Sequence, residues 1–249
     1  MNNMTLAERF RLFFSYLSEP VWQKRLLSGF GVTVRIAVFG LLIGIVIGTL
    51  IAVVKVAPKY KRYLRVLEKI CDVYVAIFRG TPMVVQLLIA YYVLLPLLGV
   101  RADAAGVGVA VFGLNSGAYV SEIMRSGLRS VEEGQMEAGR ALGLSYPVTM
   151  FKIVVPQAVR NIIPTLGNEF ISLIKETSVL SFIAIADLYT VFQKIVSNSY
   201  EPIVPYIAMA LVYIVLVLLI TALIRLTEKL MAKSDRSRGG RNNKAKEAA

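Results

Sequence analysis

The stretch that decides the fold is FGVTVRIAVFGLLIGIVIGTLIAVVKV, residues 30–56. It supplies the run of about 20 apolar residues that an α-helix needs to cross a bilayer. Glycines at positions 40, 44 and 48 recur every four residues, so they fall on one face of such a helix. Small residues at this spacing let a neighbouring helix approach closely, and we expect this face to pack against another helix of the same chain.

The composition of the whole chain also favours a membrane protein. Of its 249 residues, 56% are hydrophobic and only 18% are charged, whereas about a quarter of the residues in a soluble domain are charged. Further apolar stretches near residues 83–98, 104–124, 160–183 and 205–226 predict four more spans. We therefore expect an all-α membrane protein with five transmembrane helices.

Three segments of different composition divide the chain. Residues 28–230 hold the apolar stretches and form the expected transmembrane domain. Residues 1–27 mix aromatic and charged side chains and are interrupted at Pro20, which predicts a short amphipathic segment at the membrane interface. Residues 231–249 are basic and contain Gly and Asn, which favours a disordered cytoplasmic tail.

The basic residues predict the orientation of the chain. Segments 55–69, 125–157 and 231–249 are rich in Lys and Arg, so the positive-inside rule places them in the cytoplasm. Connections 99–103 and 186–204 are poor in basic residues and are expected outside. Five spans and a cytoplasmic C-terminus then place the N-terminus outside, although four basic residues near that end favour the opposite. The first basic segment carries Lys55, Lys59, Lys61, Arg62, Arg65 and Lys69.

The residue types exclude several kinds of partner and site. Topology and anionic lipid account for the net charge of +12 without any nucleic acid. The sequence has no histidine and a single cysteine, Cys71, which excludes an internal disulfide, a multi-cysteine metal site and histidine-based catalysis. It also lacks a nucleophile motif such as GxSxG. We therefore expect neither an enzyme active site nor a bound metal ion in this chain.

One polar segment between the apolar stretches has a pattern of its own. Residues 134–143 are GQMEAGRALG, and residues 153–156 are IVVP. The first nine residues favour a short helix, which Gly143 can end in the left-handed conformation that glycine adopts without strain. Pro147 lies early in a second short element, since proline is favoured in a first helical turn.

This segment resembles the EAA loop of ABC importer permeases. In that loop Glu-Ala-Ala, three residues, Gly, nine residues and Ile-x-Leu-Pro follow one another, and the first Glu and the Gly match Glu137 and Gly143. Ile153 matches as well, while Val155 stands where the family has Leu, and Gly139 where it has its second Ala. The resemblance implies that a short helix fits a groove on a separate ATPase subunit. The residues expected to couple the two subunits are Gly134, Glu137, Ala138, Gly139, Gly143 and Pro156.

The same segment has a partial likeness to a phosphate-binding P-loop. Gly134 and Gly139 have the spacing of its glycines, but the Lys and Ser or Thr of that motif are missing, and no strand precedes it. We therefore expect ATP and Mg²⁺ to bind the partner ATPase, and no cofactor to bind this chain.

Three further segments resemble the polar amino-acid branch of these permeases, which includes the histidine, glutamine and arginine permeases. They are residues 78–82 with Gln86 and Tyr91, residues 118–125, and residues 168–178. The resemblance implies a second permease subunit, either an identical copy or a similar chain, together with two ATPase subunits and an extracytoplasmic amino-acid-binding protein. It also implies a place in the bacterial plasma membrane.

Polar side chains within the third and fourth spans are candidates for the substrate path. A charged side chain at the centre of a span costs about 2.5–3.5 kcal/mol, so it normally faces the bundle interior or a water-filled cavity. The third span carries such residues on one helical face, and the fourth span carries them on two adjoining faces. They are Asn115, Tyr119 and Glu122 on the third span, and Asn168, Ser172 and Lys175 with Glu169 and Glu176 on the fourth.

We expect these faces to line a cavity near the middle of the membrane, where Glu122 or Glu169 receives the ammonium group of the substrate. The alternative is internal ion pairing, in which Lys175 bonds to one of these two carboxylates. At the start of the second span, Arg79, Pro82 and Gln86 are expected to have a gating or structural role, because proline can bend the chain there.

Together these patterns predict the membrane subunit of an ATP-driven ABC importer that carries a polar amino acid by alternating access. The alternative is a secondary amino-acid transporter driven by an ion gradient. Such transporters often contain inverted repeats, and this sequence shows no such internal similarity. The identity of the amino acid and the choice between a homodimer and a heterodimer of permeases stay open.

Overall fold

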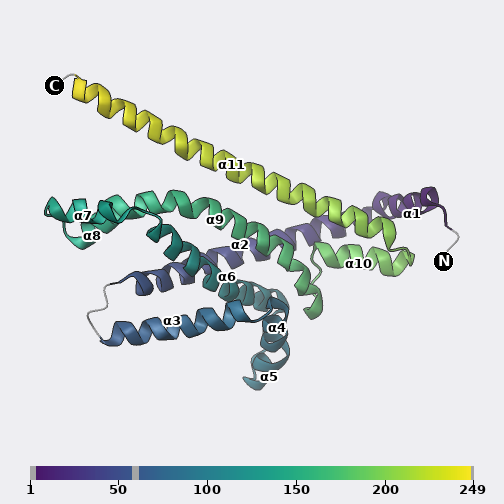
Figure 1. Ribbon diagram of the computed structural model, residues 1–249. Coiled ribbons are helices and arrows are strands. Elements are labelled where there is room, and N and C mark those ends of the chain that lie inside the picture. Colours follow the sequence, from purple (N-terminus) through teal and green to yellow (C-terminus); the bar gives the residue numbers. More distant parts are fainter. Residues whose placement is uncertain (1–3, 58–61, 248–249) are drawn as a thin grey trace. The chain divides into compact units, whose positions relative to one another are not determined.

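The apolar stretches fold as long helices in the computed structural model, which describes residues 4–57 and 62–247, with side chains described up to Leu230. Every element in these ranges is a helix (Figure 1). Lys59 and Lys61 of the expected basic loop lie outside the described residues. The elements in chain order are α1 (Leu6–Ser18), α2 (Pro20–Val56), α3 (Arg62–Gly80), α4 (Met83–Leu88), η1 (Ile89–Leu94), α5 (Leu95–Leu97), α6 (Ala104–Arg129), α7 (Glu133–Ala141), α8 (Tyr146–Thr149), η2 (Met150–Val154), α9 (Val155–Glu176), η3 (Thr177–Ile183), α10 (Leu188–Ser199) and α11 (Ile203–Glu247).

These helices form two compact units. The first holds the described residues up to Glu122 together with Glu169–Val215, and the second holds Ile123–Asn168 together with the described residues from Leu216 onward. Helices α6, α9 and α11 each contribute residues to both units.

Helix α1 lies within residues 1–27, for which the sequence predicts an amphipathic segment at the membrane interface. Thr5 caps α1 through a reciprocal capping box, in which its hydroxyl accepts from the backbone N–H of Glu8 and the Glu8 carboxylate accepts from the backbone N–H of Thr5. The Glu8 carboxylate accepts from both the backbone N–H and the hydroxyl of Thr5, and these hydrogen bonds lower the pKa of Glu8. Pro20 then begins α2, where its missing N–H costs nothing.

The glycine face of α2 packs within the chain, as the sequence predicts. An added Cβ would lie 2.9 Å from Phe112 at Gly40, 2.5 Å from the Ser116 hydroxyl at Gly44, and 2.6 Å from Val120 at Gly48. All three neighbours belong to α6, so only glycine lets the two helices come this close.

The second apolar stretch, which forms α4, η1 and α5, makes a bent pair with α3, the helix before it. Helices α3 and α4 meet at an angle of 105° across Thr81 and Pro82. Pro82 caps α4 in an extended conformation, and as a proline it also disfavours the helical conformation in Thr81 before it. Packing of Val75 on α3 against Ile51 of α2 and Ala118 of α6 buries one side of the first half.

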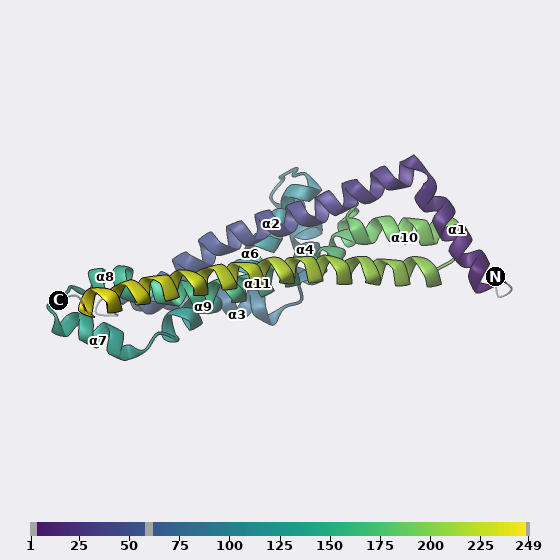
Figure 2. The same ribbon diagram turned by 90° about the horizontal axis from the view of Figure 1, so that it is seen from above.

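A correction concerns residues 186–204, which the sequence analysis treats as an external connection. Most of this segment is the helix α10, which lies alongside α2 in both views (Figures 1 and 2). Asp187 caps α10 by accepting hydrogen bonds from the backbone N–H groups of Tyr189 and Thr190. The apolar side chains of α10 recur at helical spacing and are buried, so the segment is amphipathic rather than apolar; they are Leu188, Val191, Phe192 and Ile195.

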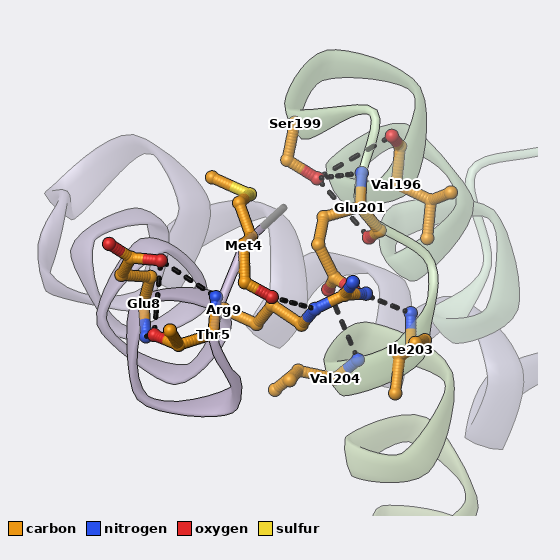
Figure 3. Close-up of polar contacts among 9 residues, drawn as sticks. All are labelled: Met4, Thr5, Glu8, Arg9, Val196, Ser199, Glu201, Ile203 and Val204. Carbon is orange, nitrogen blue, oxygen red and sulfur yellow. Dashed lines mark hydrogen bonds and ion pairs between the residues drawn. The ribbon is translucent and has the colours of Figure 1, made fainter. Parts of the chain in front are cut away.

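Helix α1 is tied to the turn between α10 and α11 by one buried carboxylate. The guanidinium of Arg9 donates to Glu201 Oε1 at 2.9 Å, and the Glu201 side chain is only 5% exposed (Figure 3). The same carboxylate accepts from the backbone N–H groups of Ile203 at 3.1 Å and Val204 at 3.2 Å (Figure 3). Glu201 therefore caps α11 and anchors α1 at once. Phe13 and Trp22 also join an apolar cluster with α10.

The second unit contains the polar segment 134–156 and the helices that support it. Gly127 on α6 leaves room for Ile162 on α9, and Gly167 on α9 leaves room for Ile224 on α11. Helix α11 continues over residues 231–247, where the sequence analysis expects a disordered tail. That stretch contains no proline and several Lys, Arg and Ala, which favour helix.

Five spans can be counted in the described residues. Helices α2, α6 and Ile203–Leu230 of α11 are each long and apolar enough to cross a membrane. Two bent pairs, Arg62–Gly80 with Met83–Leu97 and Tyr146–Ile183 with Leu188–Ser199, bring the number to five if each pair is one span. The predicted five-helix fold is confirmed on this count.

Candidate functional site

The candidate coupling loop is a helix, a left-handed turn and a second short helix. Helix α7 ends as the sequence predicts, since Gly143 has φ +79°. The turn is closed by hydrogen bonds from Leu144 N to Gly139 O and from Gly143 N to Arg140 O, both 3.0 Å long. Pro147 lies in the first turn of α8, which confirms the second short element.

Gly139 is the contact point between the two short helices of this loop. It is buried, and Thr149 of α8 occupies the space where its Cβ would lie. This contact gives a physical reason for glycine at the position where the family pattern has its second Ala. Thr149 in turn donates to the carbonyl of Ser145 at 3.1 Å, which fixes its side chain.

The other predicted coupling residues lie on the surface of the loop. Gly134, Glu137, Ala138 and Pro156 are all exposed. Two apolar side chains of the loop that no sequence pattern marks, Leu142 and Phe151, are 81% and 71% exposed. Apolar side chains this exposed in the polar segment 134–156 mark a surface that another protein can cover.

Polar contacts hold the loop to the helices beside it. Gln157 on α9 donates to the side chain of Gln135 at 3.3 Å and to the carbonyl of Ile153 at 3.0 Å. Asn161 donates to the hydroxyl of Ser130 at 2.7 Å. A hollow of about 540 Å³ lies next to these contacts, and its lining residues are Leu128, Arg129, Val131, Glu132, Glu133, Met136, Met150 and Val154.

In the first unit, Asn115 and Gln86 brace the break in the second span. The Gln86 amide donates to the carbonyls of Phe78 at 2.9 Å and Thr81 at 3.0 Å. The Asn115 amide, 4% exposed, donates to Gln86 Oε1 at 3.0 Å and to the Phe78 carbonyl at 3.3 Å. These bonds satisfy carbonyls that the end of α3 leaves without helical partners. Gln86 therefore links α4 to the end of α3 across the break, and its gating or structural role stays a prediction.

Glu122 is engaged in an ion pair, but its partner differs from the one considered in the sequence analysis. Lys55 Nζ lies 2.9 Å from Glu122 Oε1 and 2.9 Å from Asp72 Oδ1, and the Lys55 side chain is only 9% exposed. Lys175, the partner named in the ion-pairing alternative, is exposed on α9. Lys55 can reach Glu122 because the last turn of α2 brings it between α3 and α6.

Arg79 and Tyr119 are in contact next to the break between α3 and α4. The guanidinium carbon of Arg79 lies 5.3 Å from the centre of the Tyr119 ring, which is a cation–π contact. Both side chains are exposed. The predicted gating residue and the predicted path residue therefore form one surface.

The candidate residues on α9 are less closely grouped. Glu169 and Ser172 are half-buried, and the Glu169 carboxylate lies near the hydroxyl of Ser116 on α6. Asn168, Lys175 and Glu176 are exposed. Ser116 is fully buried and was not identified from the sequence, because a serine in an apolar stretch carries no pattern that marks it.

No group of three or more Cys, Asp or Glu side chains is placed to hold a metal ion in the described part of the chain.

Comparison with known families identifies the chain. Its residues 40–233 match the family described as the inner membrane component of binding-protein-dependent transport systems. The chain belongs to this family. The match favours the importer over the alternative of a transporter driven by an ion gradient.

Curated relatives of this permease family cover most of the chain. A putative glutamine transport system permease protein of Rickettsia bellii is 38% identical over 209 residues, which are 84% of this chain and 94% of that protein. An arginine transport system permease protein of Bacillus subtilis is 36% identical over 210 residues, with the same two coverages.

Solved structures agree with the fold of this permease. The crystal structure of an amino acid ABC transporter with histidines has a TM-score of 0.78 at 36% identity, covering 86% of this chain and 97% of that chain. An inward-facing structure of the methionine ABC transporter has a TM-score of 0.61 at 19% identity, covering 87% and 98%, and it supports the fold alone.

Proposed function

We propose that this permease is the membrane subunit of an ATP-driven importer that carries a polar amino acid across the bacterial plasma membrane by alternating access. The family match over residues 40–233 is the observation that carries the proposal. The relatives named for glutamine and arginine, both more than 35% identical, support an amino-acid substrate. As a permease component, the chain leaves ATP hydrolysis to a separate ATPase subunit.

The loop of α7 and α8 is the proposed contact with the ATPase. Its exposed face carries Glu137 and Ala138, and the buried Gly139–Thr149 contact holds the two short helices together as one rigid lever. A rigid lever can transmit movement when ATP closes the ATPase dimer. This movement can drive transport only if ATP binds more tightly to one conformation of the transporter than to the other.

The proposed substrate path combines polar side chains of α6 and α9. Tyr119 and Glu169 are its best-supported members in the first unit, because Tyr119 is exposed and Glu169 is near the polar Ser116. Asn115 is hydrogen-bonded to Gln86, and Glu122 is paired with Lys55. These two residues therefore affect the path through their partners rather than by binding the solute themselves. Asn168, Ser172, Lys175 and Glu176 remain in the proposed path on the strength of their helical spacing.

The proposal includes partners and an orientation. A second permease subunit and two ATPase subunits accompany the chain, and an extracytoplasmic binding protein delivers the substrate. The coupling loop and the C-terminus face the cytoplasm, and the N-terminus faces outward.

Reporter fusions test this orientation. A reporter fused after residue 102 should lie outside the cell, and a reporter fused after residue 143 should lie in the cytoplasm.

The experiment that tests the function is uptake in proteoliposomes. The chain is reconstituted with its ATPase and binding protein, and uptake of labelled amino acids is measured with ATP inside or outside the vesicle. Uptake of a polar amino acid that requires ATP on the loop side supports the proposal. Equal uptake without ATP or without the ATPase contradicts it.

A further inference from the structure

Helix α3 has three faces of different chemistry. At 3.6 residues per turn, its residues divide into three stripes about a third of a turn apart. One stripe packs on the first unit through Cys71, Val75 and Phe78. A second is apolar and exposed, and consists of Tyr63, Val66, Leu67, Ile70, Val73 and Ile77. The third, here called the polar stripe, is also exposed and consists of Arg62, Arg65, Lys69, Asp72, Ala76 and Arg79.

The two exposed stripes cannot both face lipid. The apolar stripe suits the hydrocarbon of the bilayer, because its side chains are more than 40% exposed and carry no charge. A charge facing lipid at the centre of a span costs about 2.5–3.5 kcal/mol. The polar stripe carries charges from Arg62 to Arg79, which is a rise of about 25 Å at 1.5 Å per residue. Such a stripe needs water or a polar partner along its length.

The polar stripe is continuous with the candidate path face of α6. At its far end, Arg79 lies over the ring of Tyr119. Near its middle, Asp72 shares Lys55 with Glu122 of α6, and Asp72 is still 58% exposed. Two α6 residues that are predicted to line the path therefore adjoin the stripe. Tyr119 is in contact with Arg79, and Glu122 shares Lys55 with Asp72.

The near end of the polar stripe is basic. Arg62, Arg65 and Lys69 form no ion pair with any carboxylate among the described residues. With Val66 they line a surface hollow of about 410 Å³. Free cations beside water attract anionic groups, and a carboxylate is such a group.

We propose that the polar stripe of α3 lines a water-filled passage that runs from the α6 face to the basic end of the helix, and that Arg62, Arg65 and Lys69 at that end hold the carboxylate of the solute as it leaves. The solute class rests on the proposed function, whereas the passage itself rests on the distribution of charge on α3. The competing occupant of the stripe is a second copy of the permease, which would exclude water from it.

Ala76 allows a sharp test of the passage. It lies on the polar stripe 14 residues beyond Arg62, a depth of about 21 Å. Val73 and Ile77 lie on the apolar stripe at nearly the same depth. In a Cys71→Ser background, single variants Ala76→Cys, Val73→Cys and Ile77→Cys are made in the assembled transporter in membrane vesicles. A charged, membrane-impermeant methanethiosulfonate reagent is then added from the side of Arg62.

The passage predicts that Ala76→Cys reacts at least about tenfold faster than Val73→Cys and Ile77→Cys, because only a thiol in water ionises to the reactive thiolate. Equal rates at the three positions overturn the proposal. A protected Ala76→Cys that instead forms a disulfide between two permease copies also overturns it, in favour of a subunit interface. The labelling needs neither ATP nor transport, so its failure is distinct from a failure of the proposed function.

The basic end is tested by uptake. Arg65→Gln combined with Lys69→Gln is compared with Arg225→Gln combined with Lys229→Gln, a matched loss of two exposed cations on α11. We expect ATP-driven uptake to fall several-fold in the first double variant only, with normal ATPase co-purification in both. Equal uptake by the two double variants overturns the role of the cations in solute movement.

Discussion

At the scale of single residues, two buried contacts have effects that exposed neighbours should not share. The first is Gly139, whose Cβ position is filled by Thr149. We expect Gly139→Val to force the two short helices of the coupling loop apart, at a cost of about 1–3 kcal/mol in local stability. The exposed Ala138→Val is the control. ATP-driven uptake at normal subunit assembly is the measurement, and equal uptake by both variants would show that the contact does not matter.

The second contact is the buried carboxylate of Glu201. Glu201→Ala removes the partner of Arg9 and the cap of α11 together, so we expect a loss of about 3–5 kcal/mol in the free energy of unfolding. Thermal unfolding in detergent measures this loss. Glu19→Ala, which removes an exposed carboxylate from the neighbouring turn, should leave the melting temperature nearly unchanged. A similar melting temperature for both variants contradicts the anchoring role.

At the scale of helices, the glycine face of α2 sets how closely α2 and α6 approach. Gly44→Val places a side chain where the Ser116 hydroxyl now lies, whereas Gly31, on the same helix, has nothing within 4 Å of an added Cβ. We expect Gly44→Val to abolish the folded subunit and Gly31→Val to leave it intact. Gel-filtration profiles of the two purified variants check this, and a normal profile for Gly44→Val would exclude the close contact.

Helix-scale features also show what the sequence could predict. Long apolar stretches carry enough signal to locate five spans, and the four-residue glycine spacing predicts the face that packs. Helix α10 is hard to predict because its apolar residues recur at helical spacing over only 12 residues, too few for a span. Such a segment resembles a loop until the helix it packs against is known.

At the scale of the whole molecule, the partners of polar residues were the hardest features to predict. Lys55 belongs to a basic segment that predicts a cytoplasmic location, yet its ammonium group binds Glu122, which lies 67 residues away. Arg9 and Glu201 are 192 residues apart. No local spacing connects such pairs, so only the folded chain brings them together. The coupling loop was predictable in detail because its helix, turn and proline are all local features.

The central claim is that the loop of α7 and α8 is moved by a separate ATPase subunit, and photo-cross-linking tests it directly. A benzoylphenylalanine replaces Leu142, 81% exposed on the loop, or Tyr200, 72% exposed in the turn before α11. In the assembled transporter we predict a cross-link to the ATPase from position 142 and none from position 200. A cross-link from position 200, or none from position 142, would contradict the account.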